Sequence, residues 1–153
     1  MPNTYTQITI QLIFAVRNRD SLISPQIREP LHRYITGIIK NQNEKLLIVN
    51  SVADHLHLLI GQSPTCRLSD LVREIKSESS RYINENKLSK SRFYWQEGFS
   101  AFSYSRSQRE TVINYIAHQE KHHKKTTFKE EYLDFLNKFE IDFKNEYLFD
   151  FFE

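Results

Sequence analysis

The stretch Val52-Ala53-Asp54-His55-Leu56-His57-Leu58-Leu59-Ile60-Gly61 alternates polar and apolar side chains and then becomes wholly apolar. In an extended strand, side chains two residues apart point to the same face. His55 and His57 should therefore lie side by side, while Leu56 and Leu58 point to the opposite face. The stretch predicts a strand that packs one face against a hydrophobic core.

Two neutral imidazoles on one rigid strand can hold a divalent metal ion and leave coordination positions open for a substrate. The alternative is a pair of histidines on a half-exposed strand without any ligand. The triplet His55-Leu56-His57 by itself does not decide between these two interpretations. The decision depends on the other residues of the chain.

The composition is that of a folded protein of modest size. The chain has 153 residues, 13% of them aromatic. This length predicts a single domain, residues 1–153, that buries roughly two-thirds of the surface its unfolded chain would expose. The single cysteine, Cys66, excludes an internal disulfide framework and fits a reducing cytoplasm. No apolar stretch approaches the roughly 18 residues of a membrane span, so we expect a cytoplasmic protein with no membrane partner.

Charge is distributed unevenly along the chain. Residues 67–125 contain twelve Lys and Arg against seven Asp and Glu, whereas residues 140–153 contain five acids and one lysine. A basic middle followed by an acidic tail is typical of a protein that binds a polyanion on one part of its surface. Ordinary solvated surface is the alternative.

Periodicity and turn signals place the other elements. Strands are expected at about residues 5–16, 46–49 and 99–104, with the histidine strand pairing with the second of these as a hairpin. Helices are expected at about 25–40, 68–83, 107–124 and 127–138. Pro30 either kinks the first helix or marks its start, and Ser107 is the expected cap of the third.

The order strand, helix, strand, strand, helix, strand predicts an α+β protein with the ferredoxin-like βαββαβ fold. Its four-stranded antiparallel sheet would carry helices on one face, followed by C-terminal helices. The core would span about residues 5–106, a tyrosine-bearing helix about 107–124, and a C-terminal helix with the acidic tail 127–153.

The third helix carries a second group of chemically capable side chains. Tyr115 and Gln119 are four residues apart and share a helix face, which His122 continues. Beside a bis-histidine metal site, the Tyr115 phenol can attack phosphorus, and Gln119 can supply a third, neutral ligand oxygen. A metal ion can neutralise charge on the phosphate and favour the phenolate. His118 and His122 can also form a zinc pair, although no cysteine or carboxylate completes such a set.

These residues carry a family resemblance. Asp54-His55-Leu56-His57-Leu58-Leu59 resembles the HUH motif (histidine, bulky apolar residue, histidine). Tyr115-Ile116-Ala117-His118-Gln119 resembles the nucleophile helix of single-tyrosine HUH transposases of the insertion sequence 200/605 type. Two further stretches, Ile75–Ser80 and Trp95–Ser103, resemble that family too, and the resemblance covers about residues 5–132.

The resemblance implies a function. The protein would be a prokaryotic enzyme that cuts and rejoins single-stranded DNA with hairpins at transposon ends, with Tyr115 joined to a 5′-phosphate. His55, His57 and Gln119 would hold Mg²⁺ or Mn²⁺. The enzyme would be a homodimer in which Tyr115 can act in trans. No other cofactor is expected, because rejoining needs no ATP.

Other residues have candidate supporting roles. Asp54 can orient a ligand imidazole or simply serve as a turn residue, and His122 or His123 can lie near the phosphate. Phe93, Tyr94 and Trp95 either stack on bases or pack in the core. Basic side chains that can follow a DNA backbone are Arg17, Arg19, Arg73, Lys76, Arg81, Lys90 and Arg92.

Two other functions remain open at this point. One is a non-catalytic nucleic-acid-binding protein, because ferredoxin-like sheets also build RNA-recognition domains. The other is a domesticated relative that acts only on repeats of its host. The first has no use for the paired histidines, and the sequence does not exclude the second.

Overall fold

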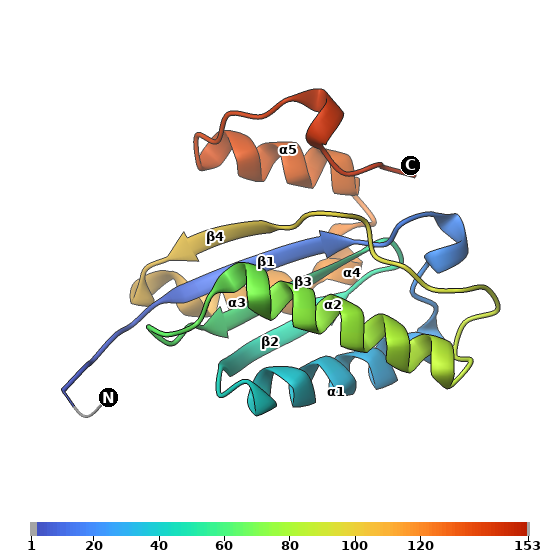
Figure 1. The fold of residues 1–153 in the computed structure, drawn as a ribbon. Helices are drawn as coiled ribbons and strands as arrows, with labels where there is room; N and C mark the ends of the chain where they lie inside the picture. Colours follow the sequence, from blue (N-terminus) through green and yellow to red (C-terminus); the bar gives the residue numbers. More distant parts are fainter. Residues whose placement is uncertain (1–2, 153) are drawn as a thin grey trace.

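The computed structural model describes residues 3–152 as a sheet with helices on both faces (Figure 1). The strands are β1 (Thr9–Ala15), β2 (Lys45–Ser51), β3 (His55–Gly61) and β4 (Ser100–Tyr104). The helices are α1 (Pro25–Asn41), α2 (Leu68–Glu85), α3 (Arg109–Ala117), α4 (Gln119–His122) and α5 (Phe128–Lys138), with 3₁₀ turns at Arg19–Ser21, Arg106–Gln108 and Asn145–Tyr147. This order confirms the predicted ferredoxin-like βαββαβ core.

The sheet is antiparallel with strand order β2-β3-β1-β4. The histidine strand β3 is therefore central: His57 lies opposite Ile13 on β1 and opposite Asn50 on β2. Because both edges of β3 are hydrogen-bonded, its side chains are held on a rigid support.

One face of the sheet carries the main hydrophobic core. Ile10, Leu12 and Phe14 of β1 point to this face together with Leu56 and Leu58 of β3, where α1 and α2 cover them. The period-two prediction for both strands is confirmed.

The second face is also covered, by the C-terminal helices. Val112 and Ile116 of α3 pack on Leu59 of β3, whereas α5 packs on Ile13 of β1 and Phe102 of β4. The two helical segments thus share this face, and the outward side chains of β3 lie at the junction between them. That arrangement makes β1 buried along its whole length.

Helix α5 is anchored at its start and along one side. The Thr127 hydroxyl accepts a hydrogen bond from the Glu130 amide, and the two residues form a capping box. Phe128, Tyr132 and Leu136 then face the sheet as buried side chains, and Phe128 also packs against Phe149 and Phe151 of the C-terminal tail. The predicted helix at 127–138 is confirmed.

Three local predictions need correction. Ser105, and not Ser107, forms the capping box before α3, with Gln108, and a 3₁₀ turn precedes the α-helix. The expected single helix at 107–124 is interrupted at His118, where the backbone leaves helical geometry (φ −105°, ψ 25°) between α3 and α4. Pro30 neither starts nor ends α1, because the helix begins at Pro25 and continues through it.

The connector before β4 is part of the core. Phe93 is fully buried and Trp95 is 9% exposed, and their rings pack edge-to-face. The core-packing alternative is therefore the correct one for these two residues, whereas Tyr94 remains exposed at 40%. None of the helices formed by residues 3–152 has the length and apolar character needed to cross a bilayer.

Candidate active site

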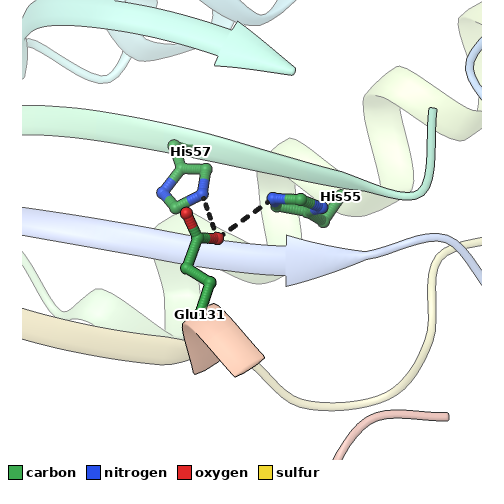
Figure 2. Close-up of side chains that lie close together, drawn as sticks. All are labelled: His55, His57 and Glu131. Carbon is green, nitrogen blue, oxygen red and sulfur yellow. Dashed lines mark hydrogen bonds and ion pairs between the residues drawn. The ribbon is translucent and has the colours of Figure 1, made fainter. Parts of the chain in front are cut away.

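His55 and His57 point to the same face of β3, as predicted, with ring centroids 5.1 Å apart. Both side chains are fully buried, so the alternative of a half-exposed strand is wrong. They occupy the junction between α3–α4 and α5, where their imidazoles turn toward a carboxylate (Figure 2).

The tyrosine-bearing segment brings its side chains to the same place. The Tyr115 ring centroid lies 6.2 Å from that of His57 in the same chain, and its hydroxyl lies 3.2 Å from His122 Nε2. Gln119 is buried, and its Oε1 lies 3.4 Å from His55 Nε2. The interruption at His118 leaves Tyr115 and Gln119 on the site, so the helical spacing predicted their proximity correctly.

His118 does not take part in this cluster. Its Nδ1 lies 2.7 Å from the Asn114 carbonyl on the exposed side of α3. The residues described here offer the grouping of His122, His123 and Glu131 instead of a His118–His122 pair. His123 also reaches Gln119, with its Nε2 3.0 Å from Oε1.

Glu131 of α5 is at the centre of the site, and the sequence analysis did not identify it. Its Oε1 lies 3.1 Å from His57 Nε2 and 3.2 Å from His55 Nε2. Its Oε2 accepts hydrogen bonds from the Tyr115 hydroxyl and, at 3.2 Å, from Gln119 Nε2. The side chain is buried. One sequence signal could have found it: Glu131 falls on the apolar face of α5, next to Tyr132 and one turn from Phe128 and Phe135.

The outer nitrogens of the two imidazoles are held by a second set of side chains. Asp54 Oδ1 lies 2.8 Å from His55 Nδ1, a position from which a carboxylate can orient a ligand imidazole. Gln11 Nε2 lies 2.7 Å from His57 Nδ1, and Gln11 Oε1 accepts a hydrogen bond from the Tyr104 hydroxyl at 2.7 Å. Both imidazoles therefore present Nε2 to the centre.

The carboxylate of Glu131 and the neighbouring imidazoles shift the pKa values of one another. Burial alone raises the pKa of the Glu131 carboxyl, but His57 and hydrogen bonds from His123 and His55 outweigh this and lower the pKa, so the carboxylate is ionised. Burial lowers the pKa of His55, but hydrogen bonds to Asp54 and Glu131 raise it overall to about 9. Burial keeps the pKa of His57 below its usual value.

Tyr115 is a protonated phenol in this arrangement. Burial, and then the negative charge of Glu131, raise its pKa above the ordinary value. Tyr115, His122 and Glu131 line a cleft of about 480 Å³ between α3 and α5. A substrate group in this cleft would meet the phenol and the carboxylate together.

The donor set suits a divalent metal ion. The ligand atoms of His55, His57 and Glu131 all lie within 4.8 Å of one another, with the Gln119 amide oxygen beside them. Two imidazoles with a carboxylate and an amide oxygen form a mixed nitrogen and oxygen set of the kind that binds transition ions such as Mn²⁺.

Comparison with known proteins identifies the family. A sequence model of the family described as "Transposase IS200 like" matches residues 4–119. The chain belongs to the IS200-like transposase family. Glu131 lies beyond the matched residues, on a helix that follows them.

This transposase is similar to a sequence relative from Deinococcus radiodurans and to two solved structures. The ISDra2 transposase TnpA of Deinococcus radiodurans is 21% identical over 118 residues, which are 74% of this chain and 84% of that protein. A crystal structure described as a transposase from Deinococcus radiodurans R1 superposes with a TM-score of 0.62, at 20% identity, over 76% of this chain and 94% of that one. A REP-associated tyrosine transposase bound to a REP hairpin superposes with a TM-score of 0.60, at 17% identity, over 79% of this chain and 72% of that one.

The candidate DNA-binding residues of the transposase lie on α2 and on the segments that follow β1 and α2. Arg17 and Arg92 lie over the exposed Tyr94 ring, 5.1 and 5.7 Å from its centroid. Lys76 donates hydrogen bonds to the carbonyls of Gln96 and Gly98, so its ammonium holds the connector before β4.

The other candidate DNA-binding residues are exposed. Arg73 and Arg81 form exposed ion pairs with acids of their own helix, α2, and Arg19 and Lys90 are exposed as well.

Proposed function

We propose that this transposase cleaves and rejoins single-stranded DNA by transesterification, with Tyr115 as the nucleophile of a covalent 5′-phosphotyrosine intermediate. In this proposal His55, His57 and Gln119 contribute to a divalent metal site, occupied by Mg²⁺ or Mn²⁺. One observation carries it: in a single chain, the Tyr115 hydroxyl and the two strand histidines meet at one buried carboxylate.

The proposed step exchanges one phosphate ester for another. The Tyr115 oxygen attacks phosphorus, and the bond from phosphorus to the 3′ oxygen breaks. The phenol proton passes to a neighbouring acceptor, either Glu131 Oε2 or His122 Nε2, and that acceptor, directly or through water, returns a proton to the departing 3′ oxygen, which becomes a hydroxyl. A bound metal ion would neutralise charge on the non-bridging phosphate oxygens. Rejoining is the reverse attack by a 3′ hydroxyl on the phosphotyrosine, which retains the phosphodiester bond energy.

The proposed substrate is single-stranded DNA that carries a hairpin. The structural relative bound to a REP hairpin supports this choice. The exposed Tyr94 ring, with the guanidinium groups of Arg17 and Arg92 beside it, combines positive charge with an aromatic side chain, as single-stranded DNA sites do. Tyr115 lies close to His57 of its own chain, which supports action in cis. The same holds if two copies form the homodimer that the family resemblance predicts.

The decisive experiment is a search for the covalent adduct. End-labelled single-stranded oligonucleotides that tile the DNA flanking the gene are incubated with the protein and Mn²⁺, then resolved on a denaturing gel. We expect a protein–DNA band that is lost in Tyr115→Phe, because this change removes only the hydroxyl. Tyr132→Phe removes a hydroxyl from α5, where it contacts Ser100, and should retain the band. A band that persists in Tyr115→Phe, or efficient cleavage of duplex DNA, would contradict the proposal.

A further inference from the structure

The carboxylate of Glu131 is placed as a ligand would be. Two atoms bound to one ion at about 2.1 Å lie about 3.0 Å apart at a right angle and about 3.4 Å apart at the tetrahedral angle. The Oε1 of Glu131 lies 3.1 and 3.2 Å from the Nε2 atoms of His57 and His55. These separations match the edges of a coordination polyhedron that shares one ion among the three side chains (Figure 2).

The surroundings of the imidazoles suit the same interpretation. A metal-binding histidine typically donates its other ring nitrogen to a carboxylate or carbonyl oxygen. His55 Nδ1 has Asp54 Oδ1 in that position. A metal ion that displaces the Nε2 proton of His55 would leave the Nδ1 proton bonded to Asp54 and would take the place of that Nε2 proton beside Glu131 Oε1.

His57 can also carry its proton on Nδ1 if the side-chain amide of Gln11 rotates. The present Gln11 orientation donates from Nε2 to His57 Nδ1 and accepts from Tyr104. Rotating the amide by half a turn would let Oε1 accept from Nδ1–H and the amide nitrogen donate to the Tyr104 oxygen. Both contacts measure 2.7 Å, and the hydroxyl can either donate or accept.

The second oxygen of Glu131 connects this site to the nucleophile. Oε2 accepts the hydrogen bond of the Tyr115 hydroxyl and lies 3.3 Å from His123 Nε2. The carboxylate is fixed in this orientation because α5 is docked by Phe128, whose ring stacks on the His55 imidazole with centroids 3.8 Å apart.

We propose that Glu131 is an anionic ligand of the metal, binding through Oε1 beside His55 and His57 while its Oε2 holds the Tyr115 hydroxyl next to the ion. The proposal rests on the proposed function and deepens it: the carboxylate comes from α5, outside the residues that match the family, and adds to Gln119 rather than replacing it. A mixed set of this kind favours Mn²⁺ over Mg²⁺.

Binding of Mn²⁺ alone tests the proposal without any DNA. The free ion is measured by electron paramagnetic resonance during titration of the wild type, Glu131→Gln, Glu131→Ala and His57→Ala. Glu131→Gln has the same shape as the wild-type side chain but no charge, and its Kd should rise about tenfold or more. Melting temperatures without metal establish that each variant is folded, and added Mn²⁺ should raise them less in the Glu131 variants than in the wild type.

Glu130→Gln is the matched control. It makes the same change one residue away, at an exposed position, and glutamine still completes the capping box with Thr127. Its Mn²⁺ affinity should equal that of the wild type.

The outcomes separate this proposal from the proposed function. Wild-type affinity in Glu131→Gln, with binding lost in His57→Ala, would overturn the role of Glu131 and leave the histidine site intact. Tighter Mn²⁺ binding or faster cleavage in Glu131→Gln would show that the carboxylate competes with the metal, which also overturns the proposal. Absence of Mn²⁺ binding by the wild type would overturn it too, and the adduct assay would then judge the proposed function by itself.

Discussion

Tyr115 and His57 of the same chain contact opposite oxygens of one carboxylate. The Tyr115 hydroxyl donates to Glu131 Oε2, and His57 Nε2 lies 3.1 Å from Oε1. The proposed nucleophile and the histidine strand β3 are thus connected without a second copy of the chain. This relationship bears directly on whether the enzyme acts in cis or in trans.

We expect that inactive variants will not complement each other. His57→Ala and Tyr115→Phe should each lower adduct formation by at least about 10³-fold, and an equimolar mixture should remain as inactive as either one. In a cis enzyme each active site takes its tyrosine and its histidines from one chain. Every chain of the mixture lacks one of these two groups, so no complete site can form. The measurement is the denaturing-gel assay after co-refolding of the two variants.

Mixtures of each variant with the wild type are the control and should retain activity in proportion to the wild-type chain. Recovery of activity in the mixture of the two variants would mean that Tyr115 reaches the histidines of a partner, as the family resemblance allows.

Gln11 should be needed for metal affinity, although it does not contact the metal position. Gln11→Leu leaves His57 Nδ1 and the Tyr104 hydroxyl without their shared partner, so the imidazole loses its fixed orientation. The Mn²⁺ Kd should rise about 10- to 100-fold, while single-stranded DNA is still bound. The control is Gln7→Leu, the same change at an exposed position near the start of β1. An unchanged Kd in Gln11→Leu would show that the Gln11 amide does not position His57.

Phe128 should couple the stability of α5 to the site. Its side chain is 1% exposed and stacks on His55 with an angle of 3° between the rings. Phe128→Ala removes a buried aromatic ring and should lower the free energy of unfolding by about 3–4 kcal/mol, measured by urea titration. It should also weaken Mn²⁺ binding, because Glu131 is one turn away on the same helix.

Phe143→Ala provides the comparison for that experiment. Phe143 is 41% exposed, and its removal should change the free energy of unfolding by no more than about 0.5 kcal/mol. Equal effects of the two substitutions would mean that α5 is not held in place by its contact with the sheet.

The parts of the site that follow local rules could be predicted from the sequence. The alternation of β3 places His55 and His57 on one face, and four-residue helical spacing places Tyr115 and Gln119 on another. Both rules depend only on backbone geometry. The spacing survives the interruption at His118, because that interruption affects a single residue between two helical turns.

Glu131 could not be placed in the same way. Its position depends on how α5 docks, which is decided by buried contacts of Phe128 and Tyr132 with distant strands and with the C-terminal tail. The sequence shows only an acid within an apolar helix face. Full burial of the histidines had the same cause, since it requires α3 and α5 to cover the second face of the sheet. Lys76 likewise could not be distinguished from exposed lysines until the connector before β4 was seen to fold over it.

The protein should lose stability in mild acid partly through His32 of α1. His32 Nε2 lies 2.8 Å from the Ser51 hydroxyl, and burial, followed by the charge of Arg28, lowers its pKa from 6.5 to about 4. Because the folded-state pKa is below the unfolded one, the unfolded chain takes up a proton first as the pH falls. This contribution to stability is complete above pH 6.5 and is lost progressively as the pH falls toward 4. At pH 5 the loss should be about 1–2 kcal/mol, after allowance for solvent screening at a partly buried group.

The comparison of the wild type with His32→Gln isolates this contribution, since every other titrating group is shared by the two proteins. Glutamine can still hydrogen-bond Ser51 but cannot be protonated, so its free energy of unfolding should fall less between pH 7.5 and pH 5. Urea titrations at several pH values measure the difference. Parallel pH profiles would mean that the pKa of His32 is the same in the folded and the unfolded state.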